Sequence, residues 1–106
     1  MPNEEYAVRP IADVRLTGAG QAVARPCYLY GWVLEAEATA TDADLYDGYG
    51  VAGVTPPGIL RVSIGAPIQS AYLSWLPRPM WFKQGIFVAI SGTTPAITIF
   101  YDPMPG

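Results

Sequence analysis

The chain has no histidine, and it has only one cysteine, Cys27, and one lysine, Lys83, among its 106 residues. Without an imidazole it lacks the usual general base near neutral pH, and no histidine can activate a serine or Cys27 as a nucleophile. A Ser–Lys pair would depend on Lys83 alone. A single cysteine excludes an internal disulfide, and without histidine it cannot complete a tetrahedral zinc site.

Carboxylates are the remaining candidates for chemistry. Glu35 and Glu37 share a strand face, but paired glycosidase carboxylates stand about 5–9.5 Å apart across a sugar cleft, which a domain of this size rarely forms. Asp42, Asp44 and Asp47 lie close together in "DADLYDG". A calcium loop starting at Asp42 needs an oxygen ligand at its fifth position and glycine at its sixth, where this chain has Tyr46 and Asp47. We therefore expect no enzymatic activity, no metal site and no cofactor.

Charge is also scarce. Charged residues make up 14% of the chain and hydrophobic residues 51%, whereas typical domains have about 25% charged residues. So few charges leave apolar surface that other chains are expected to cover. The net charge is -3 and the six basic residues are spread along the sequence, which argues against a nucleic-acid partner.

The ends and hydrophobic runs carry no membrane signal. The N-terminal "MPNEEY" is acidic and polar, unlike a signal peptide, and no apolar run approaches the roughly 18 residues of a membrane span. These features predict synthesis in the cytoplasm and no membrane partner.

Eleven prolines and 11 glycines divide the sequence into short runs rich in Val, Ile and aromatic residues, which is typical of an all-β domain. Strands are expected at 11–16, 21–25, 27–36, 42–47, 58–65, 70–76, 85–91 and 96–101. We predict one antiparallel β-sandwich domain over residues 1–106, a jelly roll of about eight strands, with extended terminal arms at 1–10 and 102–106. The segments 47–58 and 76–85 are expected to be loops, the second stiffened by prolines.

Alternation along "CYLYGWVLEA" places Tyr28, Tyr30 and Trp32 on one face and Leu29 and Val33 on the other. Neither set is polar. The face that does not meet the opposite sheet is therefore expected to be covered by a loop or by a neighbouring chain.

The aromatic residues suggest two functions. A carbohydrate- or receptor-binding module would combine aromatic platforms with Asn, Gln and Asp, but the chain has one asparagine and three glutamines. A protein interface is favoured because Trp, Tyr and Arg dominate interface hot spots. The residues predicted to bind a partner are Tyr30, Trp32, Trp75, Arg78, Trp81 and Phe82.

The order "VRLTGAGQAV", "LYGWVLEA", "ATDADLYDG", "PMWFKQGIFVAISG" and "TTPAITIFY" resembles the small β-sandwich structural proteins of tailed-bacteriophage virions, over roughly residues 13–101. The resemblance implies a virion component without catalytic residues. A capsid decoration (cement) protein is the preferred member, and a head-tail or tail-associated component is the alternative. Its expected partners are other copies of itself, with a trimer as one option, and a major capsid or other virion protein; its expected location is the virion.

Overall fold

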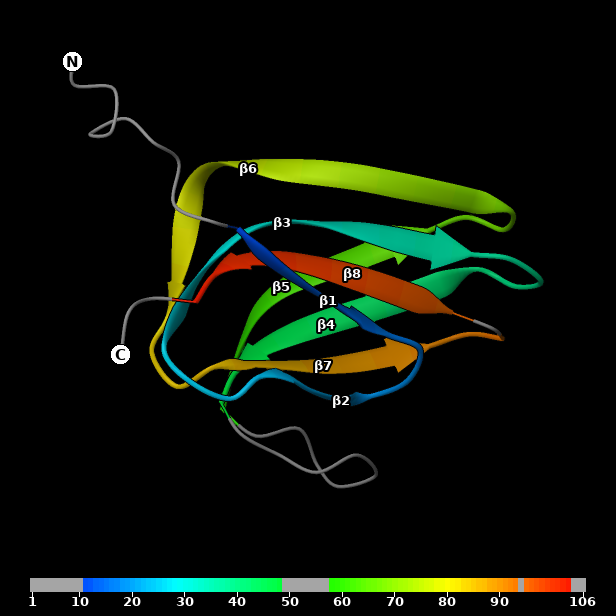
Figure 1. Cartoon of the computed structure of the whole chain (residues 1–106). Coiled ribbons are helices and arrows are strands. Elements are labelled where there is room, and N and C mark those ends of the chain that lie inside the picture. The colour runs from blue at the N-terminus through cyan, green and yellow to red at the C-terminus, as the bar shows by residue number, and fades with distance from the viewer. Residues whose placement is uncertain (1–10, 49–57, 94, 104–106) are drawn as a thin grey trace, which may run out of the picture.

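The computed structural model describes residues 11–48, 58–93 and 95–103, which form two four-stranded antiparallel sheets packed face to face (Figure 1). The predicted arm at 1–10, residues 104–106 of the predicted arm at 102–106, and most of the predicted 47–58 loop lie outside these residues. The strands are β1 (Ala12–Leu16), β2 (Gly20–Val23), β3 (Cys27–Ala36), β4 (Thr41–Asp47), β5 (Ile59–Ala66), β6 (Ser70–Phe82), β7 (Ile86–Ser91) and β8 (Ala96–Asp102). Asp102 therefore ends β8 and is buried, although the sequence prediction assigned it to an arm.

The strand order is that of a jelly roll, as predicted. The first sheet has the order β1-β8-β3-β6 and the second has β2-β7-β4-β5. The chain crosses between the sheets after every strand except β4, so that two Greek keys wrap around one core. The edges of the first sheet are β1 and β6.

One hydrophobic core fills the space between the sheets. Leu29 and Leu34 of β3, Leu45 of β4, and Ile97 and Ile99 of β8 are fully buried in it. These residues alternate with half-buried or exposed ones along their strands, which is the period-two pattern of a sandwich strand.

A β-bulge in β3 changes which side chains share a face. The register with both neighbouring strands shifts between Leu29 and Gly31, and relative to β8 Tyr30 is an extra residue. Tyr28 then lies on the outer face whereas Trp32 points into the core with 7% exposure. The prediction that Tyr28 and Trp32 share a face was wrong, because simple alternation cannot anticipate an inserted residue.

The other correction concerns β6, which was expected to end at residue 76. It runs for 13 residues, through Pro77 and Pro79, to Phe82. Its first part pairs with Gly31–Ala36 and its last three residues pair with Cys27–Leu29, while residues 76–79 have no partner in β3. Prolines are tolerated there because β6 is an edge strand and no ladder hydrogen bond is required of them. The strand bends near this end (Figure 1).

Candidate interaction surface

Large exposed apolar side chains concentrate on β6. Its Tyr72, Leu73, Trp75 and Trp81 are 40–57% exposed. Among the described residues, the other exposed large apolar side chains lie at Ile11, Ile59, Leu60 and Ile68. The edge strand β6 is therefore the richest source of unburied apolar surface in the described part of the chain.

Strand register gathers several of these residues on the outer face of the first sheet. Trp81 pairs with Tyr28, Trp75 with Gly31, and Leu73 with Val33, and opposite residues in an antiparallel pair project to the same side. On the far side of β3, Gly31 pairs with Phe100 of β8. We call this group the aromatic face; its members are Tyr28, Val33, Leu73, Trp75, Trp81 and Phe100.

Gly31 makes room for the ring of Trp75. A Cβ atom at Gly31 would lie 2.3 Å from the carbonyl oxygen of Ser74 and 2.8 Å from Cε3 of Trp75. The Trp75 ring reaches Phe100, with ring centroids 5.1 Å apart and an angle of 33° between their planes. Trp75 of the edge strand β6 and Phe100 of the inner strand β8 thus cover part of the outer face of β3. Trp75 still keeps 54% of its surface exposed.

The second aromatic pair lies near the end of β6. The ring centroids of Tyr28 and Trp81 are 4.9 Å apart, and the ring planes are tilted by 52°. The guanidinium of Arg61 on β5 donates a hydrogen bond of 2.9 Å to the carbonyl oxygen of Trp81. It also lies 5.4 Å from the centre of the Phe82 ring. These contacts connect the end of β6 to the second sheet and fix the position of Trp81.

The six residues predicted to bind a partner are divided by the structure. Trp75, Arg78 and Trp81 are exposed on β6. Trp32 and Phe82 belong to the core, and Phe82 is fully buried, so neither side chain can meet a partner while the domain stays folded. Alternation explains the result for Phe82, because it follows Trp81 and projects to the opposite side.

Tyr30 occupies the bulge and is half-buried. Its hydroxyl donates a hydrogen bond of 3.4 Å to Oδ2 of the buried Asp102. This contact ties β3 to the end of β8 and gives Tyr30 a structural role.

Sequence reasoning did not single out Leu73, Tyr28 or Phe100 for the surface. Leu73 is 57% exposed, but the residues around it in the sequence resemble those around a core leucine. The available signal was the alternation of "SAYLSWL", which puts Leu73 and Trp75 on one side of the strand. Assigning that side to solvent required the position of β6 at an edge.

The outer face of the second sheet is polar near the start of β4. Asp42 and Asp44 project from it beside Gly65, Ser63 and Ser91. Oδ1 of Asp44 accepts a hydrogen bond of 2.8 Å from the hydroxyl of Ser63. Further along β4, Tyr46 pairs with Leu60 and Phe87, so this face becomes apolar toward the end of the strand.

Asp47 has a structural partner in the turn between β6 and β7. Its carboxylate accepts hydrogen bonds from the backbone N–H groups of Lys83 (2.9 Å) and Gln84 (2.8 Å). Oδ2 also lies 4.0 Å from the guanidinium of Arg61. Within residues 11–48, 58–93 and 95–103, no three His, Cys, Asp or Glu side chains lie close enough together to hold a metal ion.

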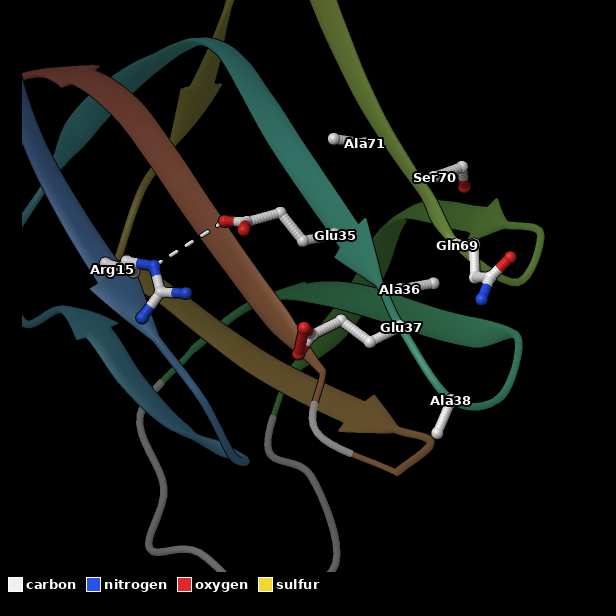
Figure 2. Close-up of a pocket in the computed structure, with 8 residues that line it drawn as sticks. All are labelled: Arg15, Glu35, Ala36, Glu37, Ala38, Gln69, Ser70 and Ala71. Carbon is white, nitrogen blue, oxygen red and sulfur yellow. Dashed lines mark ion pairs between the residues drawn. The ribbon is translucent and has the colours of Figure 1, made fainter.

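A hollow of about 650 Å³ lies where the ends of β3 and β6 meet near β1 (Figure 2). Glu35 and Arg15 form an ion pair there, with 3.5 Å between Oε2 and Nε, and the Glu37 carboxylate points the same way. Most of the lining residues are exposed. The hollow therefore has a solvated ion pair and lacks the enclosed carboxylate pair that sugar hydrolysis requires. Its lining residues are Arg15, Glu35, Ala36, Glu37, Ala38, Gln69, Ser70 and Ala71.

Cys27 is fully buried at the start of β3. Burial, helped by the negative charge of Asp47, raises the pKa of its thiol to about 12. The thiol is therefore neutral near neutral pH and poorly suited to act as a nucleophile.

Comparison of the chain with protein-family models, with curated proteins and with solved structures finds no match. In the part of the chain that the structure describes, no helix is long and apolar enough to cross a membrane.

Proposed function

We propose that this protein is a non-enzymatic structural component of a tailed-phage virion, a capsid decoration protein that binds the shell and other copies of itself. The observation that carries the proposal is the aromatic face, where Leu73, Trp75 and Trp81 are 40–57% exposed. Clusters of exposed aromatic and aliphatic side chains without charge are typical of the centre of protein interfaces.

The fold supports the proposal without deciding it. Jelly rolls occur in viral capsid proteins, but also in lectins and in cupins. The sequence resemblance to small virion β-sandwich proteins favours the first of these. Stabilisation of a shell requires only that neighbouring subunits be bridged, and an aromatic face on a two-layer sandwich is suited to this because the core behind it is rigid.

The direct test is to locate the protein. Particles produced by the genome that encodes this chain would be purified and their proteins identified by mass spectrometry, and a reconstruction would then place the chain. We expect it on the capsid exterior with the aromatic face against the shell. Finding it at the head-tail junction or on the tail would support the alternative virion role, and its absence from purified particles would refute both.

A binding assay assigns the contact surface. Particles stripped of the chain would be incubated with purified protein and sedimented. Trp75→Ser and Trp81→Ser are expected to weaken binding at least tenfold, because each removes a large apolar anchor. Ile59→Ser is the matched control, since Ile59 is 71% exposed on β5 of the second sheet and is not a member of the aromatic face. Glycan binding by the isolated chain with no particle binding would instead favour a carbohydrate-binding module.

A further inference from the structure

The outer edge of β6 is open along its first half. Ser70–Trp75 pairs with Gly31–Ala36 of β3 without interruption on one side. On its other side, no strand within the described residues pairs with it. An open strand edge presents unpaired backbone N–H and C=O groups, and natural proteins usually protect such edges with charges, prolines, bulges or short length.

The other three edge strands carry such protection. β1 has five residues and includes Asp13 and Arg15. β5 has Arg61 within it, and β2 has only four residues and a register shift. The Ser70–Trp75 segment has no charged residue and no proline. Protection on β6 begins only with Pro77, beyond this segment.

The side chains next to this edge are also exposed. Leu73 and Trp75 project from the outer face, and Tyr72 projects from the opposite side with 49% of its surface exposed. The second sheet therefore does not cover β6 completely at Tyr72. An additional strand placed against β6 would bury apolar side chains on both sides of the sheet and would also satisfy the backbone.

We infer that β6 pairs with β6 of a second copy of this chain, antiparallel across a two-fold axis at Leu73, to join the two first sheets into one eight-stranded sheet. A two-fold axis perpendicular to the sheet places the outer faces of both copies on the same side of the joined sheet. Residues of the outer face must therefore pair with residues of the outer face. With the axis at Leu73, Leu73 opposes its own copy and Trp75 opposes Ala71, which pairs a large side chain with a small one.

Moving the two-fold axis by one residue along β6 shifts the register by two residues, and both of these registers are less favourable. An axis at Tyr72 places Trp75 opposite Gln69, whose φ of 57° has already left the strand conformation. An axis at Ser74 extends the overlap into residues 76–79, where pairing with β3 is lost. The register centred on Leu73 alone overlaps Ala71–Trp75 completely in both copies.

This inference rests on the proposed function in that it names the surface through which copies associate, but it can be tested without particles. The mass of the purified full-length chain would be measured by light scattering up to high concentration. We expect twice the 11.4 kDa of one chain. Because Leu73 opposes itself, Leu73→Lys alone and Leu73→Glu alone should each give monomers, and an equimolar mixture of the two should restore the dimer. Ile68→Lys, at an exposed apolar position in the preceding turn, should leave the dimer intact.

A cross-link checks the register. Leu73→Cys should form a disulfide dimer under mild oxidation, because opposed residues in antiparallel strands have Cα separations of about 4.5–5.5 Å that a disulfide can span. Ile68→Cys should not, and the buried Cys27 adds no background. A monomeric unsubstituted chain, a dimer that persists in both charged variants, or a mixture that stays monomeric would overturn the inference. If the chain dimerises in this way but is absent from particles, the proposed function fails and the inference stands. If the chain is found on particles but is a monomer in solution, the inference fails and the proposed function stands.

Discussion

At the scale of single residues, Gly31 determines whether the aromatic face can form. We expect Gly31→Ala to lower the free energy of unfolding by about 1–3 kcal/mol, because the added methyl group overlaps the Ser74 carbonyl oxygen and the Trp75 ring. Urea denaturation measures the effect. Gly20→Ala in β2 is the control, since a Cβ there has no neighbour within 4 Å. Equal stability of the two variants would contradict the close approach of Trp75 to β3.

Cys27 gives a second prediction at this scale. The folded thiol has a pKa of about 12, against an ordinary value of 9.0. Between these values the unfolded chain loses the proton while the folded chain retains it, so stability contributed by the neutral thiol is present below pH 9 and is lost as the pH rises toward 12. The unsubstituted chain should therefore lose stability more steeply above pH 9 than Cys27→Ala does, measured by urea denaturation across that range. Parallel curves would show that the thiol ionises freely in the folded state.

Adjacent residues at the end of β6 should behave in opposite ways. Phe82→Ala is expected to cost about 3–5 kcal/mol of stability, because it empties a fully buried site. Trp81→Ala removes an exposed ring that contacts Tyr28 and should cost about 1 kcal/mol or less, while particle binding falls. Thermal unfolding and sedimentation separate the two effects. A large loss of stability in Trp81→Ala would mean that this ring belongs to the core.

At the scale of elements, the turn between β6 and β7 depends on a side chain of β4. Asp47→Ala should lower stability by about 2–3 kcal/mol, because the backbone N–H groups of Lys83 and Gln84 lose a charged acceptor. Asp42→Ala, at an exposed position on the same strand, should change stability by no more than about 0.5 kcal/mol. Unfolding in urea compares them. Similar values would show that the Asp47 carboxylate does not hold this turn.

The same scale shows what the sequence could and could not predict. Alternating Val, Ile and aromatic residues between glycines and prolines identify the strands and hence the sandwich, because burial of one face imposes a period of two. The bulge at Tyr30 has no such signature, so Trp32 was assigned to the wrong face. Pro77 and Pro79 suggested a loop because proline cannot serve an inner strand, but β6 is an edge, and that position depends on the order of strands in the sheet.

The candidate surface was predictable to the same extent. The segment "WLPRPMWF" was predicted to bind a partner; it lies on β6, where Trp75 and Trp81 are exposed. Phe82 is buried because β6 continues past residue 76 and brings this side chain to the core. Leu73 is exposed because β6 lies at an edge of the first sheet. Both are tertiary facts that local sequence patterns do not contain.

At the scale of the whole molecule, the aromatic face occupies the inner strands and β6 edge of the first sheet, while the charged Asp13 and Arg15 lie beside it on β1. Asp42 and Asp44 lie on the second sheet, whereas the aromatic face occupies the first. A particle that binds the aromatic face would thus leave the acidic face toward solvent. With a net charge of -3, the exposed face would also help to keep decorated particles apart through like-charge repulsion.

The uncharged side chains of the aromatic face predict how association responds to salt. Because no member of the aromatic face is charged, salt has few ionic contacts to screen in this interface. Raising sodium chloride to about 1 M should therefore change the dissociation constant for the stripped particle by no more than about threefold. Burial of apolar surface should give a negative heat-capacity change, measured by calorimetry at several temperatures. Trp75→Ser should reduce that change, and Asp44→Asn on the polar face should not. A loss of binding of more than tenfold in high salt would instead assign the contact to ionic groups such as Arg78.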